Sequence, residues 1–101
     1  MKRPVRFHRL AEREFLEAAQ YFERERAGLG EAFIDAVESR IAEIVEFPDA
    51  GTILVGDVRR RLVRRFPYSV LYTIRRDHIR LLAVMHAKRR PMYWVDRESI
   101  P

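Results

Sequence analysis

Histidine, arginine and tyrosine gather within a short stretch near the C-terminal end of the chain, at His86, Arg89 and Tyr93. A histidine can transfer protons near neutral pH. An arginine can stabilise the charge that develops on a phosphate during cleavage, and a tyrosine can stack on a base. These are the groups that metal-free RNA cleavage needs. In a purely structural interpretation, His86 caps the end of a strand, and Tyr93 and Trp94 close the sheet.

A run of five arginines precedes this group, within one segment of extended character. Side chains alternate between the two faces of a strand. The run is therefore expected to divide into Arg59, Arg61 and Arg65 on one face and Arg60 and Arg64 on the other. Five cations repel one another, so an anionic ligand is one interpretation. The other is a charged edge strand that prevents sheet-to-sheet aggregation, and the two are compatible.

These basic and aromatic residues define two candidate sites. If the chain cleaves RNA, we expect a catalytic set that shares one face near the end of the sheet: Arg61, His86, Arg89 and Tyr93. The candidate surface for a partner protein or a nucleic acid is wholly basic: Arg59, Arg61, Arg64, Arg65, Lys88 and Arg90.

Charge is segregated along the chain, which has a formal net charge of +5. Residues 1–50 carry 8 Lys+Arg and 11 Asp+Glu, whereas residues 51–101 carry 12 Lys+Arg and 4 Asp+Glu. All basic side chains except Lys2 and Lys88 are arginines, the residue that suits planar phosphate and carboxylate groups. The basic half therefore indicates a polyanionic or acidic partner.

Several classes of protein are excluded or disfavoured. The chain has no cysteine, which excludes disulfide scaffolds and thiol nucleophiles and favours a reducing compartment, the cytoplasm. The histidines His8, His78 and His86 lack metal-ligand spacing. We also find no glycine-rich phosphate loop, no nucleophile elbow, no secretory signal and no membrane-spanning run. We expect neither a metal nor a cofactor, and no membrane association.

Periodicity predicts the elements that must position these residues, within one domain over residues 1–101. The 101 residues suffice for a single core. Period-2 alternation predicts strands, and apolar residues at helical spacing predict helices. A loop is expected over 49–57. The elements follow in the order strand 4–7, helix 9–26, helix 29–47, and strands 58–65, 68–75 and 78–87. The expected fold is α+β, β-α-α-β-β-β, with a helical hairpin packed on a small antiparallel sheet.

The apolar stripes of the two helices are expected to form the core against the sheet. Their principal members are Phe15, Phe22, Phe33, Val37, Ile41 and Ile44. The last strand is apolar on both faces, so it should lie inside the sheet. Strict alternation places Ile79, Leu81, Ala83 and Met85 on one face and Leu82, Val84 and His86 on the other.

The ordered set of motifs resembles the RelE/ParE superfamily of toxins from bacterial type II toxin–antitoxin systems. The first helix carries AEREFLEA followed by Tyr21-Phe22, and the second carries Leu29-Gly30 before its apolar stripe and Pro48. The strands carry Val58-Arg59-Arg60, FPYSVLY over 66–72 and the segment 79–84. The resemblance closes with His86, Arg89, Pro91, Tyr93-Trp94 and Arg97.

The resemblance implies the same β-α-α-β-β-β fold and a cognate antitoxin that wraps the toxin. RelE-like members cut mRNA on the ribosome; by this likeness Arg59 and Arg61 match basic strand positions, and Arg89 and Tyr93 match a C-terminal pair. ParE-like members instead poison DNA gyrase. The motifs at 66–68 and 91–94 favour the ParE-type, plasmid-stabilisation-like branch, and hence inhibition of gyrase or replication. Ribosome-dependent mRNA cleavage and a non-toxic nucleic-acid-binding module stay as alternatives.

The expected antitoxin has an acidic, partly disordered segment that folds on contact with the basic half of the toxin. Such a segment can lie as a helix over the helical hairpin or add as a strand beside Val58–Arg65. Contact that includes the sheet is favoured, because the uncompensated arginines are expected there.

Overall fold

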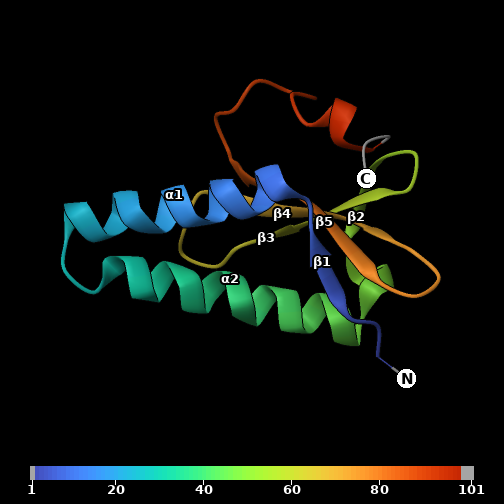
Figure 1. The fold of residues 1–101 in the computed structure, drawn as a ribbon, viewed down its shortest axis with the longest axis horizontal. Coiled ribbons are helices and arrows are strands. Elements are labelled where there is room, and N and C mark those ends of the chain that lie inside the picture. Colours follow the sequence, from blue (N-terminus) through green and yellow to red (C-terminus); the bar gives the residue numbers. More distant parts are fainter. Residues whose placement is uncertain (1, 99–101) are drawn as a thin grey trace.

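The computed structural model describes residues 2–98, which form two helices, a sheet and a C-terminal segment (Figure 1). The helices are α1 (Arg9–Glu25) and α2 (Leu29–Glu46). The strands are β1 (Val5–Phe7), β2 (Thr52–Val55), β3 (Val58–Leu62), β4 (Tyr68–Ile74) and β5 (Ile79–His86). Short 3-10 turns cover Pro48–Ala50 and Val95–Glu98. The α+β fold with a helical hairpin on a sheet is confirmed.

The sheet differs from the expected one in two details. Its strand order is β1-β5-β4-β3-β2, and β1 pairs parallel to β5 while the other pairs are antiparallel, so the sheet is mixed. The segment predicted as a loop over 49–57 contains β2, which pairs with β3. The prediction missed β2 because this strand is exposed on both faces and shows no apolar alternation.

The position of β2 also bears on the expected antitoxin contact. Strand β3 lies between β2 and β4, and β2 pairs with its residues Val58–Arg60. A partner strand therefore has no free edge beside Val58–Arg60, and the expectation of a strand along the whole of Val58–Arg65 does not hold for that part.

The two helices form an antiparallel hairpin, joined by Gly28 in the left-handed region at φ +87°. Glycine adopts this conformation without the steric cost that a Cβ brings. The carboxylate of Glu23 accepts hydrogen bonds from the backbone N–H groups of Gly28 and Gly30, at 3.0–3.1 Å. It thereby caps the start of α2 from the end of α1.

Both faces of the sheet are covered. On one face α1 and α2 enclose a core that includes Phe33, Val37 and Ile44, all fully buried, with Phe15, Phe22 and Ile41 packed against it. On the other face the C-terminal segment lays Trp94, only 2% exposed, on a second cluster: Val58, Leu71, Leu82 and Ala83. The expected helix core and the closing of the sheet by Trp94 are both confirmed.

A bulge in β5 changes which side chains face the helices. Leu71 pairs with Ala83 and Tyr72 pairs with Leu81, so Leu82 is an extra residue on β5. The prediction that Ile79, Leu81, Ala83 and Met85 share a face was wrong, because the extra residue shifts the alternation by one. Beyond the bulge, Ala83 and Met85 join the cluster under Trp94, and Val84 joins the helix-side core.

Candidate functional site

The carboxylate of Glu14 on α1 joins three parts of the fold. Its oxygens accept hydrogen bonds from the backbone N–H of Val84 on β5 (3.1 Å), the hydroxyl of Tyr93 (2.6 Å) and both terminal nitrogens of Arg97 (2.9 and 3.0 Å). The side chains of Glu14 and Arg97 are only 14% and 10% exposed. This carboxylate therefore fixes the C-terminal segment against α1 and β5.

Sequence reasoning missed Glu14, although a signal for it exists. Glu14 lies three residues after Ala11 and four before Ala18, both of which are buried on α1. Residues at these spacings share one face of a helix. A carboxylate on the buried face needs a cationic or hydrogen-bonding partner, and Arg97 is that partner.

A hollow of about 210 Å³ opens beside Glu14, between α1, the end of the sheet and the C-terminal segment. Its lining is aromatic, acidic and basic: Glu14, Glu17, Ala18, Tyr21, Tyr68, Val84, His86, Arg89 and Tyr93. The structure thus brings together three of the four candidate catalytic residues, His86, Arg89 and Tyr93. We call this the tyrosine hollow.

The reactive groups in the tyrosine hollow are held in structural contacts. Burial and the hydrogen bond to Glu14 raise the pKa of Tyr93. The guanidinium of Arg89 lies over the Tyr93 ring, 3.9 Å from its centre. Nδ1 of His86 accepts the backbone N–H of Lys88 at 2.9 Å, so His86 caps the turn that follows β5. The Tyr93 hydroxyl and Nδ1 of His86 are therefore both engaged within the protein.

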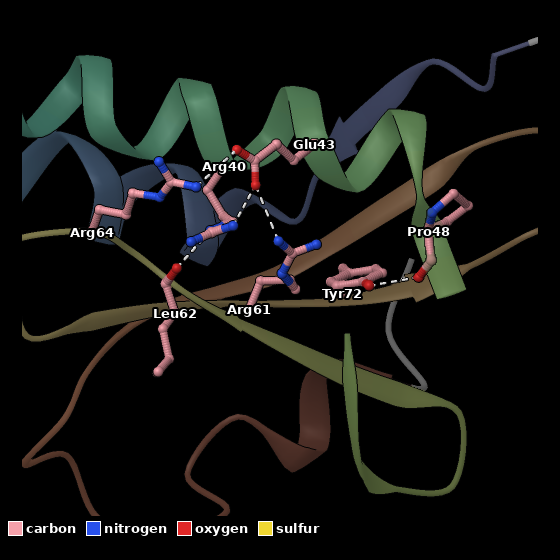
Figure 2. A network of polar contacts seen from close by, with 7 residues as sticks. All are labelled: Arg40, Glu43, Pro48, Arg61, Leu62, Arg64 and Tyr72. Carbon is pink, nitrogen blue, oxygen red and sulfur yellow. Dashed lines mark hydrogen bonds and ion pairs between the residues drawn. The ribbon is translucent and has the colours of Figure 1, made fainter. Parts of the chain in front are cut away.

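Arg61 lies elsewhere, beside α2. Its guanidinium contacts Glu43 at 3.0 Å, and Arg40 and Arg64 bind the same carboxylate (Figure 2). Arg61 lies on the helix-side face of the sheet, in register with Val70 and, across it, Val84. It does not line the tyrosine hollow with His86, Arg89 and Tyr93, because Glu43 binds its guanidinium. Glu43 is the second functional residue that sequence reasoning missed. It lies three positions after Arg40 on α2 and forms an ion pair with it.

The remaining arginines of this run are also placed differently from the prediction. Arg59 donates hydrogen bonds to the backbone carbonyls of Asp49 and Gly51, both at 3.0 Å. Strand β3 ends at Leu62, and Arg65 adopts a left-handed φ of 72°. Alternation therefore stops before Arg64. The guanidinium of Arg64 lies 3.6 Å from the Glu43 carboxylate on the helix side, so Arg64 does not share a face with Arg60 as expected.

The cations that follow β5 are less engaged. Among residues 2–98, Lys88 and Arg90 have no side-chain hydrogen bond or ion pair, and the side-chain contact of Arg89 is with the Tyr93 ring. We call residues 88–90 the basic turn.

Within residues 2–98, no helix is long and apolar enough to cross a membrane. This part of the chain also holds no group of three or more acidic or histidine residues arranged for a metal ion.

Comparison with known proteins gives a family match and a fold match. A family model described as the ParE toxin of type II toxin-antitoxin system, parDE, matches residues 5–91. The fold resembles a chain of the solved structure "Chromosomal ParDE TA system from P. aeruginosa", with a TM-score of 0.64 and 18% identity over 84% of this chain and 96% of that chain. No curated protein matches the sequence. Since the family model spans most of the chain, this protein belongs to the ParE family of toxins of type II toxin–antitoxin systems.

Proposed function

We propose that this toxin inhibits DNA gyrase by binding, and that it does not cut RNA. The observation that carries the proposal is the state of the candidate catalytic groups. The Tyr93 hydroxyl donates to Glu14 at 2.6 Å, and His86 caps the basic turn through Nδ1. Membership of the ParE family supports the same target, because ParE-like toxins act on gyrase.

Metal-free RNA cleavage has weaker support in this geometry. It requires a base for the 2′-hydroxyl, an acid for the leaving oxygen and a cation at the phosphate, all within reach of one substrate. Arg61 is bound to Glu43 beside the other helix. The raised pKa of Tyr93 opposes its ionisation, so this side chain is a poor base. The family is one of toxins, so the alternative of a non-toxic nucleic-acid-binding module is set aside.

The surface proposed to face the target combines the basic turn with the tyrosine hollow. Lys88 and Arg90 are exposed cations free to bind an anionic partner, and the hollow offers rings and hydroxyl groups beside them. Charged surfaces of this kind accelerate association with oppositely charged partners. The action is proposed to take place in the cytoplasm, where chromosomal DNA and gyrase are found.

The proposed antitoxin contact uses an acidic segment that orders on binding. The positive charge of the second half of the chain supports an acidic partner.

The proposal is tested by induced expression in a bacterial host. We expect loss of DNA supercoiling and an SOS response, with mRNA left intact. Fragmented mRNA with normal supercoiling would favour the nuclease alternative. Co-expression of the antitoxin serves as the control, because it should restore growth in either case.

A further inference from the structure

The Glu43 cluster beside α2 carries more positive than negative charge. One carboxylate serves Arg40, Arg61 and Arg64 (Figure 2). Arg40 also donates from Nε to the carbonyl oxygen of Leu62 at 2.6 Å. The side chains of Arg40 and Arg61 are only 12% and 20% exposed, so two cations share one carboxylate in a partly buried place. Such a cluster gains stability from a second anion, because partly buried charges are costly when they are incompletely paired.

A hollow of about 220 Å³ lies next to this cluster, between α2 and the turn that follows β3. We call it the α2 hollow. Its lining combines charged groups with small apolar ones: Ala32, Asp35, Ala36, Ser39, Arg40, Glu43, Arg64 and Arg65. Volume of this order accommodates one side chain of a partner.

Two arginines at the mouth of the α2 hollow are available to a partner. Arg64 is 76% exposed and approaches Glu43 only to 3.6 Å, which is too long for a good hydrogen bond. Arg65 is exposed and holds a left-handed φ of 72°, a conformation that glycine or asparagine adopts more easily. A strained backbone at a charged, exposed residue is a reason to look for a binding role. At this turn the two consecutive arginines, Arg64 and Arg65, line the same hollow.

We propose that the α2 hollow receives a carboxylate side chain of the antitoxin, which binds Arg64 and Arg65. The inference rests on the antitoxin partnership of the family and adds the place and the chemistry of the contact. Guanidinium groups bind carboxylates through paired, charge-assisted hydrogen bonds. The methyl groups of Ala32 and Ala36 can pack on the aliphatic part of the incoming side chain.

An acidic peptide fits this surface better than a nucleic acid does. The side of α2 next to the hollow carries Asp35 and Glu43, and the same helix also carries Glu31, Glu38 and Glu46. A phosphate backbone carries a charge at every nucleotide and would meet these carboxylates repeatedly. A peptide needs only one carboxylate at this point and can place neutral residues beside the acids of α2.

The test measures binding of the purified antitoxin encoded with this toxin to wild-type toxin and to the double variant Arg64→Glu and Arg65→Glu. We expect the dissociation constant to rise about 100-fold, because two charge pairs become repulsive. The single variant Arg64→Lys keeps the charge but loses the planar fork, so its loss should be smaller. The control is Arg76→Glu, another exposed arginine, on the turn between β4 and β5, which should change affinity less than about twofold.

The thermal midpoints of all variants are compared first, so that loss of binding is distinguished from loss of folding. Arg64→Gln replaces the double variant if the double variant unfolds. Equal losses in the double variant and in Arg76→Glu would overturn the inference. So would a double variant that binds the antitoxin normally but loses affinity for a short DNA duplex. If wild-type toxin fails to bind the antitoxin, the partnership fails as well. Gyrase takes no part in this measurement, so its result is independent of the proposed target.

Discussion

Arg97 and Glu14 lie 83 residues apart in the sequence and form a two-pronged ion pair, with nitrogen–oxygen distances of 2.9 and 3.0 Å. Arg97 also donates to the carbonyl oxygen of Leu82 at 3.0 Å. Strand β1 pairs only with Ile79–Leu81, so this ion pair satisfies backbone groups of β5 beyond the end of β1. The two side chains therefore make the hydrogen bonds to β5 that a longer β1 would make, and they hold the C-terminal segment in place.

The ion pair leads to a prediction for stability. Arg97→Ala leaves Glu14 partly buried without its counter-charge, and the free energy of unfolding should fall by about 3 kcal/mol. Arg90→Ala, at an exposed and unpaired position, should change it by less than about 0.5 kcal/mol. Urea denaturation followed by circular dichroism gives both values. Equal midpoints for the two variants would show that the ion pair contributes little.

His8 predicts a dependence of stability on pH. It caps α1 by accepting the N–H of Leu10 on Nδ1, and its side chain is buried near the charges of Arg80, Arg97, Arg9 and Glu14. Burial, and next the charge of Arg80, lower the pKa of His8 from its ordinary 6.5. Below pH 6.5 the unfolded chain therefore binds more protons at His8 than the native protein does. The contribution of His8 to the free energy of unfolding is complete above pH 6.5 and decreases as the pH falls below it.

The variant His8→Asn isolates this effect, because asparagine is a good helix cap that does not titrate. Unfolding free energies measured between about pH 8 and 5.5 should show a shallower slope for the variant than for the wild type. The same slope in both proteins would mean that other groups cause the acid sensitivity.

The aromatic core predicts a large effect at Phe33. This side chain is fully buried, and its ring centre lies 5.0–6.0 Å from those of Phe15, Phe22, Phe66 and Tyr68. Phe33→Ala should lower the free energy of unfolding by about 4 kcal/mol, much of the stability of a small domain. Leu16→Ala, at a residue that is 56% exposed, is the matched control. A thermal midpoint unchanged by Phe33→Ala would contradict the packing described.

Inhibition by binding predicts that the candidate catalytic groups are dispensable. The double variant His86→Ala and Tyr93→Phe should still arrest growth when its expression is induced. Loss of the Tyr93 hydroxyl should cost about 1–2 kcal/mol of stability, because one charge-assisted hydrogen bond is removed. Colony counts after induction are compared with the thermal midpoint of the purified variant. Loss of toxicity in a well-folded variant that still binds gyrase would favour catalysis.

The basic turn predicts a charge-dependent effect on the target. Lys88→Glu combined with Arg90→Glu should raise the toxin concentration needed for half-inhibition of gyrase about tenfold, because electrostatic attraction is lost. Arg24→Glu combined with Arg76→Glu changes the net charge equally at two other exposed positions. If both double variants lose potency to the same degree, net charge and not this surface controls the effect.

The sequence predicted both helices and the strands β1, β3, β4 and β5, because these elements carry clear apolar periodicity. It missed β2, whose four residues are all exposed. It also misplaced the side chains on either side of Leu82, because nothing in local periodicity marks a bulge. Of the candidate site, the grouping of His86, Arg89 and Tyr93 was predicted correctly, since these residues are close in sequence.

The parts of the site that depend on long-range contacts could not be predicted in this way. The spacing of Glu14 places it on the buried face of its helix, but the sequence does not show which arginine Glu14 or Glu43 binds. Their partners Arg97 and Arg61 lie 83 and 18 residues away. Only the folded chain shows that these carboxylates neutralise the arginines. Lys88 and Arg90 are among the cations without a side-chain partner within residues 2–98, and they lie next to the tyrosine hollow in the sequence.

The most direct test of the proposed function is a supercoiling assay with purified gyrase, relaxed plasmid and the purified toxin. Inhibition by binding predicts that supercoiled product decreases as toxin is added and that the double variant His86→Ala and Tyr93→Phe still inhibits. Added antitoxin should restore supercoiling. Normal supercoiling at all toxin concentrations, together with cleavage of mRNA on translating ribosomes by the same preparation, would contradict the account.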